Sequence, residues 1–378
     1  MSIKQGLIDN IKNIRGWKTG RRIVVFSIDD YGNVRLDSKE AKEKMERDGK
    51  QFQSRFDLYD SLENREDLEM LLEALNTVKD KYGRAAVFTP FALPCNIDFE
   101  RMAEENYEEY HYELLPQTYE KLEAKHGDSY QGAWNLWKQG IAEGLLVPQF
   151  HGREHLNLKV FNEKLKAREP SLMRALKNRS FAAISPSSFT TIGFTAAFEF
   201  WDMEENLVFD EIIRDGLNAF EHVYGYRSVH FNPPGGREHP IIHKALQENG
   251  IKYLDTPWVK QEHMGNGLFR RVINHSGKEN HLGMIYEVRN VVFEPTEPGI
   301  DWVSYALKQI ETAFRWNRPA LISSHRVNFC GHIDPNNRKL GISALRALLN
   351  AIVTKWPDVE FMSANQVGDL MGQSKGIK

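Results

Sequence analysis

The feature that most constrains the fold of this chain is a series of short apolar runs separated by segments of helical period. The runs are rich in Val, Ile, Leu and Phe and have the length of buried strands. They cover 22–28, 85–89, 145–150, 228–231, 251–254, 285–288, 320–323 and 359–362. The helical segments cover 67–81, 131–143, 206–224, 239–249, 302–316 and 340–355. Strands that alternate with helices predict right-handed βαβ units and a parallel sheet.

This pattern predicts an α/β fold with a single (β/α) barrel, distorted and TIM-like, of seven or eight parallel strands. The 378 residues could form two domains, but α/β barrels routinely exceed about 250 residues as one unit. We find no low-complexity linker and no short repeat in the sequence. We therefore expect a barrel domain over residues 21–378, preceded by an N-terminal helix over residues 1–20.

The N-terminal helix is predicted to be amphipathic and basic. Its apolar positions recur on one helical face, at Ile3, Leu7, Ile11 and Ile14, and lysines and arginines add positive charge. Such a helix can lie on a membrane surface. We favour the alternative, in which the apolar face packs across the amino-terminal side of the barrel, because amphipathicity mostly reports core packing.

Composition excludes several kinds of partner. With 49 basic and 52 acidic side chains the formal charge is -3, which does not suit a non-specific nucleic-acid binder. No run approaches the roughly 18 apolar residues of a spanning helix, and no apolar signal core begins the chain. We expect a cytoplasmic protein in which the two cysteines, Cys95 and Cys330, are reduced thiols.

The first apolar run ends in two adjacent carboxylates, Asp29 and Asp30, followed by Tyr31 and Gly32. Burying two neighbouring charges is costly, so stability gives a strand no reason to end this way. An isolated Asp-Asp pair is usually a solvated turn or a helix cap. A catalytic or metal-binding role for Asp29 and Asp30 therefore depends on which residues follow the other predicted strands.

Two histidines four residues apart, His151 and His155, follow the third run. On a helical turn both side chains would face the same way. Two neutral imidazoles and one carboxylate make a three-ligand site for Zn²⁺ or a similar cation, with an open position for water. In a chain with 13 histidines, a chance pairing is the alternative.

Two further strand ends carry residues that suit a site. His325 follows the run at 320–323, and a loop with Asn232, two prolines and two glycines follows Phe231. The prolines fix the backbone, whereas the glycines permit positive φ or a close approach. Taken singly, His325 would be a satisfied core histidine and the loop a rigid turn.

Together these four segments, in this order and at strand ends, resemble the polysaccharide deacetylase family, also called the NodB-homology or carbohydrate esterase 4 group. That family has an apolar strand ending in a Phe-Asp-Asp-Gly-like motif, then His-x-x-x-His, an Arg-x-Pro-x-Gly-like loop and a final Leu-x-His. The resemblance extends from Ile23 to Met362. The sugar deacetylases named after YdjC are similar too, through the segments 29–32 and 155–158.

The resemblance implies a metal-dependent hydrolase that removes acetyl groups from an N-acetylated sugar or polysaccharide, with metal-bound water as the nucleophile. It implies that Asp29 is the general base and His325 the general acid. It also implies that Asp30, His151 and His155 bind one divalent cation. One carboxylate and two imidazoles suit the borderline softness of Zn²⁺.

We expect the substrate to be a neutral acetylated carbohydrate, because the chain has no strong field to collect charged polymers. The loop at Asn232, Pro234 and Gly235 would contact it. Aromatic side chains on the strand-end loops, with Trp258 and Trp302 as the leading candidates, would stack on the apolar face of the sugar.

The chain also departs from the family pattern. Asn232 stands where the family carries the arginine that orients the base, and Tyr31 is inserted before Gly32. The Asp-x-x-Asp-Trp segment of the family is not evident. Three arginines could replace the missing one: Arg237, Arg289 and Arg326.

Two other functions stay open. The segment 151–155 also fits the His-x-x-Glu-His pattern of inverzincin peptidases, with Glu154 as base, but that pattern needs a continuous helix and leaves Asp29 and Asp30 unexplained. A carbohydrate-binding barrel with weakened catalysis would explain the missing arginine. Metal-dependent release of acetate would distinguish the enzyme from such a binding protein.

Overall fold

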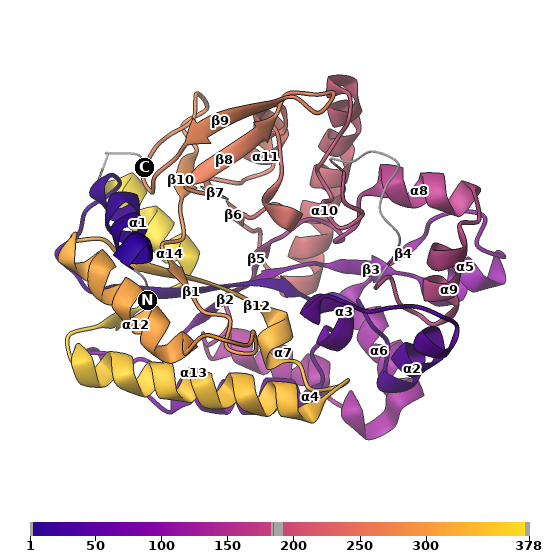
Figure 1. Cartoon of the computed structure of the whole chain (residues 1–378), viewed down its shortest axis with the longest axis horizontal. Coiled ribbons are helices and arrows are strands. Elements are labelled where there is room, and N and C mark those ends of the chain that lie inside the picture. Colours follow the sequence, from indigo (N-terminus) through magenta and orange to yellow (C-terminus); the bar gives the residue numbers. More distant parts are fainter. Residues whose placement is uncertain (1–2, 183, 185–191, 375–378) are drawn as a thin grey trace.

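The structure is a computed structural model that describes residues 3–182, 184 and 192–374. A curled parallel sheet lies at the centre of the molecule (Figure 1). The strands follow the order β10-β7-β6-β5-β2-β1-β12-β11, and β13 pairs with the start of β1. Their bounds are β1 (Ile23–Tyr31), β2 (Phe88–Ala92), β5 (Gln149–Phe150), β6 (His230–Phe231), β7 (Tyr253–Asp255), β10 (Ile285–Glu287), β11 (Val291–Val292), β12 (Ala320–His325) and β13 (Glu360–Phe361). The predicted α/β class and the distorted, TIM-like barrel are confirmed.

Each of the eight predicted runs contains part of a strand, whereas β11 was not predicted. The two edge strands of the sheet, β10 and β11, follow each other in the chain. In the described residues no backbone pairing joins them. The barrel is therefore open on this side. Two two-stranded antiparallel sheets outside the main sheet were not predicted either: β3 (Cys95–Ile97) with β4 (Tyr112–Leu114), and β8 (Val259–His263) with β9 (Phe269–Ile273).

Side-chain alternation along β1 determines which of its residues face the interior of the barrel. Val24, Phe26 and Ile28 join the large core under the helices, whereas Ile23 and Val25 join the barrel interior. The interior core also contains Phe91, Tyr253, Ile285 and Leu321 from neighbouring strands. Because side chains on a strand alternate with period two, a residue at position 29 faces the same interior as Val25.

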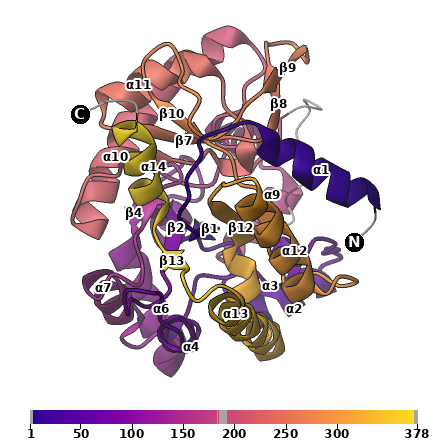
Figure 2. The same cartoon turned by 90° about the vertical axis from the view of Figure 1, so that its left-hand side faces the viewer.

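Helices surround the sheet on its outer side (Figures 1 and 2). Their bounds are α1 (Ile3–Ile14), α2 (Lys39–Arg47), α3 (Arg55–Tyr59), α4 (Arg65–Asn76), α5 (Phe99–Glu104), α6 (Leu115–His126), α7 (Ala133–Ala142), α8 (Leu158–Lys166), α9 (Pro170–Lys177), α10 (Phe209–Tyr224), α11 (His243–Glu248), α12 (Trp302–Arg315), α13 (Pro335–Lys355) and α14 (Ala364–Gln373). The six predicted helical segments correspond to α4, α7, α10, α11, α12 and α13. Helix α13 begins earlier than predicted because Asp334 caps its first turn and Pro335 suits the first helical position.

Helix α1 packs beside α12 at the amino ends of β11 and β12 (Figure 2), through polar contacts. Gln309 Nε2 donates to Asp9 Oδ1 at 3.0 Å, and Asn290 Nδ2 donates to Asn13 Oδ1 at 2.8 Å. The exposed fractions of its apolar residues are 61%, 42% and 49%, for Leu7, Ile11 and Ile14. The expectation that this apolar face packs on the barrel is therefore wrong, because buried polar side chains on the other face make the contact.

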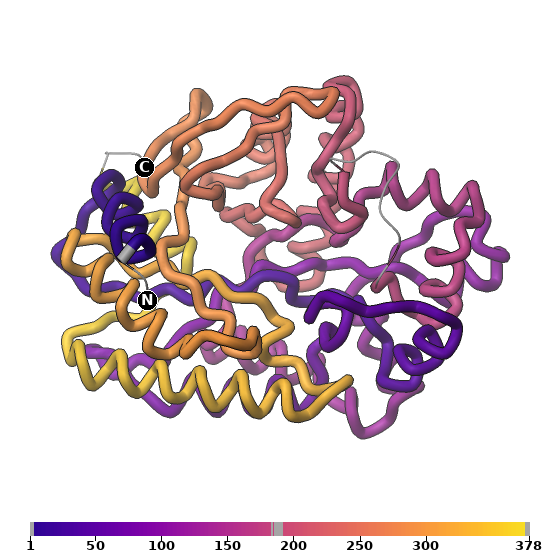
Figure 3. Tube along the Cα trace, in the orientation of Figure 1, coloured from indigo at the N-terminus to yellow at the C-terminus, as the bar shows by residue number. Residues whose placement is uncertain are grey.

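The first and last parts of the chain lie side by side (Figure 3), where Trp17 Nε1 donates to Ser374 Oγ at 3.0 Å. Both cysteines are buried and free, so no disulfide joins Cys95 to Cys330. Among the described residues, no helix has the length and apolarity that crossing a membrane requires.

Candidate active site

A cavity of about 570 Å³ lies at the carboxyl ends of the parallel strands. The five residues predicted for metal binding and proton transfer all line it: Asp29, Asp30, His151, His155 and His325. They come from the ends of β1, β5 and β12 and the loop after β5. The sheet therefore brings together residues that lie almost 300 positions apart in the sequence.

The backbone at Asp30 lets two adjacent carboxylates face one cavity. Asp30 has a φ of +75°, and the pairing of β1 with β2 shifts register between Ile28 and Tyr31. Without this bulge, consecutive side chains would point to opposite faces. A positive φ is unfavourable for a residue with a Cβ atom, and such strain is typically found at functional sites. Tyr31 is inserted here to fill the outer core, where its ring meets the edge of Trp137.

Asp30, His151 and His155 form a compact set of donor atoms. Their potential ligand atoms lie within 4.8 Å of one another, and all three residues are buried. Asp30 Oδ1 lies 2.9 Å from His155 Nε2 and 3.4 Å from His151 Nε2. Burial alone would raise the pKa of Asp30, but the neighbouring His155 holds it well below its usual range.

A backbone carbonyl orients the first histidine of this set. His151 Nδ1 lies 2.7 Å from Asn232 O, which can only accept a hydrogen bond, so Nδ1 carries the proton. The lone pair of His151 Nε2 then faces Asp30. In many metal sites a histidine ligand is oriented in the same way, by donating its other ring N–H to a backbone carbonyl. Residues 151–157 do not form a helix, so a helical turn does not bring the two histidines together; the turn at Gly152, with a φ of +109°, brings the rings to 5.2 Å instead.

Asp29 is held by an arginine and an amide. Arg289 Nη1 and Nη2 donate to the two Asp29 carboxylate oxygens, each at 2.8 Å, and Asn232 Nδ2 donates to Oδ1 at 2.7 Å. Arg289 Nε also donates to Asp255 Oδ2 at 2.6 Å. Burial would raise the pKa of Asp29, but the Arg289 charge and hydrogen bonds lower it.

Of the three candidates for the missing arginine, the structure brings only Arg289 to Asp29. Arg237 instead pairs with Glu199 at 3.1 Å, and the buried Arg326 pairs with Asp60 at 2.8 Å. Asn232, at the position where the family carries arginine, adds a neutral hydrogen bond to the same carboxylate. A charged bidentate contact and an amide contact together replace one arginine.

His325 is paired with a carboxylate behind it. Its Nδ1 lies 2.7 Å from Glu294 Oε1, and its Nε2 lies 4.0 Å from Asp29 Oδ2, beyond hydrogen-bond distance. Burial would lower the pKa of His325, but Glu294 raises it to about 9. Glu294 is itself held by Arg55 and by Asn328 Nδ2, which donates to it at 2.7 Å.

The residues predicted for substrate binding divide into two groups. Asn232, Gly235 and Trp258 line the cavity, whereas Pro234 is buried and does not line it. Trp302 does not line it. Its indole is buried in the first turn of α12, where Nε1 donates to Glu297 O at 2.8 Å.

Sequence reasoning named Arg289 only as one of three candidate arginines, and it missed Asp255 and Glu294 as site residues. Asp255 and Arg289 directly follow predicted strands, so the position at a strand end was a usable signal for both. Glu294 follows β11, a two-residue strand too short to recognise. The cavity is also lined by Lys12 from α1, which no pattern in the sequence linked to the site.

Glu154, the base in the peptidase alternative, does not line the cavity. Its carboxylate accepts from Arg153 Nε at 2.7 Å and from the Tyr110 hydroxyl at 3.1 Å. The residue is buried, and its neighbours occupy its oxygens. Together with the absence of a helix at 151–157, this contact pattern excludes the arrangement that an inverzincin peptidase needs.

Comparison with known proteins gives similarity at the level of structure. No family model matches the chain, and no curated protein sequence matches it. An allantoinase structure covers 96% of this chain and 94% of its own, with 10% identity and a TM-score of 0.48. A putative polysaccharide deacetylase from Mycobacterium smegmatis covers 96% and 94%, with 13% identity and a TM-score of 0.44. A probable polysaccharide deacetylase from Pseudomonas aeruginosa covers 95% and 93%, with 10% identity and a TM-score of 0.46. At these identities the likeness concerns the fold alone.

Proposed function

We propose that this chain is a metal-dependent hydrolase that removes the acetyl group from an N-acetylated sugar or polysaccharide. The observation that carries the proposal is one cavity that holds a compact Asp-His-His set beside a carboxylate and a protonatable histidine. Amide hydrolysis needs these parts: activation of water, removal of its proton and protonation of the departing amine. Each part has a candidate among the lining residues.

Asp30, His151 and His155 would hold one divalent cation. The fit rests on the donor set, whose potential ligand atoms lie within 4.8 Å of one another, and on His151 Nε2, which is buried and has no hydrogen-bond partner among the described residues. Their one-carboxylate, two-imidazole composition suits Zn²⁺ and leaves positions for water and substrate. When bound, the cation would supply Lewis-acid polarisation of a carbonyl and a lower pKa for water.

Asp29 would act as the general base. Its contacts with Arg289 and Asn232 fix the orientation of the carboxylate, and its pKa below the usual range keeps it ionised. An ionised carboxylate has about four lone-pair positions, so the contacts it makes leave capacity for a proton from water. The lowered pKa makes Asp29 a weaker base, and its fixed position compensates through proximity.

His325 would act as the general acid. With a pKa raised to about 9 by Glu294, its ring is protonated at neutral pH. Glu294 accepts from Nδ1, and Nε2 makes no hydrogen bond to Asp29, so the Nε2 proton can be directed to a leaving amine. An amine departs poorly without this proton.

The carbohydrate part of the proposal rests on the cavity wall. Trp258 lies among the lining residues with Pro233 and the two glycines of the loop after β6. An indole beside a proline-glycine loop provides an apolar surface for the face of a sugar ring, and the polar residues below it would reach the acetamide.

Release of acetate from a panel of N-acetylated and O-acetylated saccharides tests the proposal. We expect release that depends on added Zn²⁺ and falls about 10²–10⁴-fold in Asp29→Asn, which keeps the shape but removes the proton acceptor. Glu154→Gln is the matched control, because Glu154 is a buried acid outside the cavity. Cleavage confined to peptides, or equal loss in both variants, would contradict the proposal.

A further inference from the structure

We infer that a second divalent cation binds inside the barrel, between His230 of β6, Asp255 of β7 and Glu287 of β10. These three strands are neighbours in the sheet, in the order β10-β7-β6. Glu287 pairs in register with Asp255, and His230 pairs with Tyr253, two residues before Asp255. Side chains at these positions project from the same face, so the three residues converge by the register of the sheet.

The spacing of the three side chains suits a shared ion. Their potential ligand atoms lie within 4.8 Å of one another, which leaves a central point about 2.8 Å or less from each atom. First-row cations bind His and carboxylate ligands at about 2.0–2.2 Å, so small side-chain movements would complete the bonds. One imidazole and two carboxylates form a mixed N/O donor set for a first-row divalent cation such as Zn²⁺, Mn²⁺ or Co²⁺.

The unpaired polar atoms of the cluster favour a bound ion over a direct hydrogen bond between His230 and Glu287. His230 and Glu287 are both fully buried. Among the described residues, both ring nitrogens of His230 and both carboxylate oxygens of Glu287 have no hydrogen-bond partner. Buried polar atoms are nearly always paired, because an unpaired one has lost its hydrogen bonds to water without replacement. A protonated Glu287 bonded to His230 would satisfy two of these atoms, but the two groups do not form that bond.

Burial disfavours charge on both Glu287 and His230 in the absence of an ion. Burial raises the pKa of Glu287 well above its usual value, and Asp255 adds to this effect. Burial, assisted by the Arg289 charge, lowers the pKa of His230 to about 3, so the imidazole is neutral and offers a lone pair. A divalent cation would offset the buried carboxylate charge and use that lone pair.

The residues around the cluster provide a route for the ion and fix the orientation of the His230 imidazole. Asp255 also lines the cavity above, so a cation can reach the cluster from there. Arg289 occupies Asp255 Oδ2 through its Nε, which leaves the other Asp255 oxygen available. Phe91 and Tyr253 meet the His230 ring edge-on, with centroids 5.2 and 5.8 Å away, and hold its orientation. A bound ion would therefore also position the Asp255–Arg289 pair that holds Asp29.

Metal counting on the full chain tests this inference, independently of any activity. After equilibration with Zn²⁺ and removal of free metal, elemental analysis should find two ions per chain in the parent and one in Glu287→Gln, which keeps the side-chain shape. His151→Ala/His155→Ala should also retain one. Glu294→Gln, a buried acid on the other side of the cavity, should keep two.

The second measurement does not depend on whether Glu287→Gln folds. In His151→Ala/His155→Ala loaded with Co²⁺, the remaining ion should give visible d–d bands, and a chelator should abolish them. A parent that binds one ion, lost in His151→Ala/His155→Ala, would overturn the inference and leave the proposed function intact. One ion lost only in Glu287→Gln would support the inference and contradict the metal site of the proposed function.

Discussion

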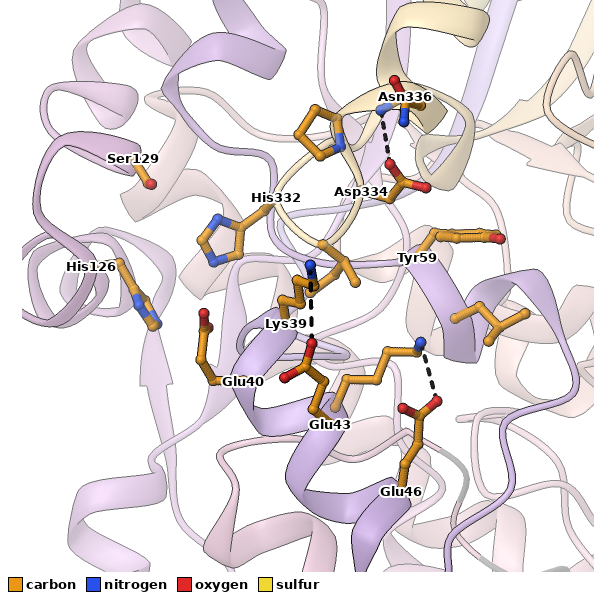
Figure 4. Close-up of a pocket in the computed structure, with 14 residues that line it drawn as sticks. Lys39, Glu40, Glu43, Glu46, Tyr59, His126, Ser129, His332, Asp334 and Asn336 are labelled. Atoms are coloured by element: carbon orange, nitrogen blue, oxygen red, sulfur yellow. Dashed lines mark hydrogen bonds and ion pairs between the residues drawn. The ribbon is translucent and has the colours of Figure 1, made fainter.

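Two cavities in this molecule differ in size and in chemistry, and the larger one is the poorer candidate. The larger, of about 950 Å³, lies between α2, the end of α6 and the start of α13 (Figure 4). Its charged side chains mostly pair along one helix, as Lys39 does with Glu43 at 4.0 Å and Lys42 with Glu46 at 3.2 Å. The smaller, of about 570 Å³, collects buried charges from separate strands.

The proposed site therefore rests on the convergence of buried groups and not on the volume of the cavity. An exposed ion pair four residues apart on a helix contributes little, because water competes for both partners. In the smaller cavity, Asp29, Arg289 and Asp255 are nearly excluded from water and satisfy one another. Removing one such partner leaves a buried charge uncompensated, which destabilises the fold. Buried charge clusters of this kind are typical of functional sites.

The largest difference between the two cavities should appear in activity. Asp29→Asn should lower the rate of acetate release about 10²–10⁴-fold, because the general base is lost while the fold is kept. Glu43→Gln, in the larger cavity, should leave the rate unchanged. Steady-state kinetics on the same substrate measure both, and a comparable loss from Glu43→Gln would reverse the assignment of the two cavities.

The next largest effect should appear in stability. Arg289→Ala removes the buried countercharge that Asp29 and Asp255 share, and we expect a loss of about 3–5 kcal/mol in the free energy of unfolding. Lys39→Ala should cost less than about 1 kcal/mol, since its ion pair is exposed. Urea unfolding followed by circular dichroism gives both values. Equal losses in the two variants would show that the Arg289 network is no more costly to break than a surface pair.

A smaller effect should appear in pH dependence. The general acid must be protonated, so the rate should fall as pH rises through the His325 pKa of about 9. Glu294→Gln removes the negative charge that raises this pKa, and the alkaline limb of the pH–rate profile should move to lower pH. Glu40→Gln, beside the larger cavity, is the control. An unmoved limb in Glu294→Gln would mean that another group sets it.

The smallest effect separates amides from activated esters. His325→Ala should slow the hydrolysis of an N-acetyl sugar more than that of an aryl acetate, because a phenolate departs without a proton and an amine does not. Metal content is measured in the same samples. Equal slowing of both substrates at unchanged metal content would assign His325 a structural or oxyanion-directed role instead.

The sequence predicted the parts of the molecule that depend on local pattern. The apolar runs located eight strands, and parallel strands bring their carboxyl ends to one edge, so Asp29, His151 and His325 meet in one cavity as expected. The sequence could not choose among three arginines, because the curl of the sheet decides which one reaches Asp29. For the same reason Trp302 was placed wrongly beside the cavity: α12 packs its indole into the core.

The inner face of α1 shows a second limit of pattern reasoning. Apolar periodicity predicts a packed face, but the contacts of α1 with α12 and Asn290 are polar and depend on residues more than 270 positions away. The positive φ of Asp30 was also hidden, because no residue type at that position indicates a bulge. Contacts between residues far apart in the sequence determine both features.

Metal-dependent acetate release tests the central claim most directly. The full chain is stripped with a chelator, and release from the best saccharide of the panel is measured as Zn²⁺ is added back. The account predicts no release from the stripped protein, recovery on adding Zn²⁺ to the parent, and no recovery in His151→Ala, with Glu154→Gln recovering like the parent. Undiminished release from the stripped protein, or full recovery in His151→Ala, would contradict the claim that Asp30, His151 and His155 hold the cation on which the reaction depends.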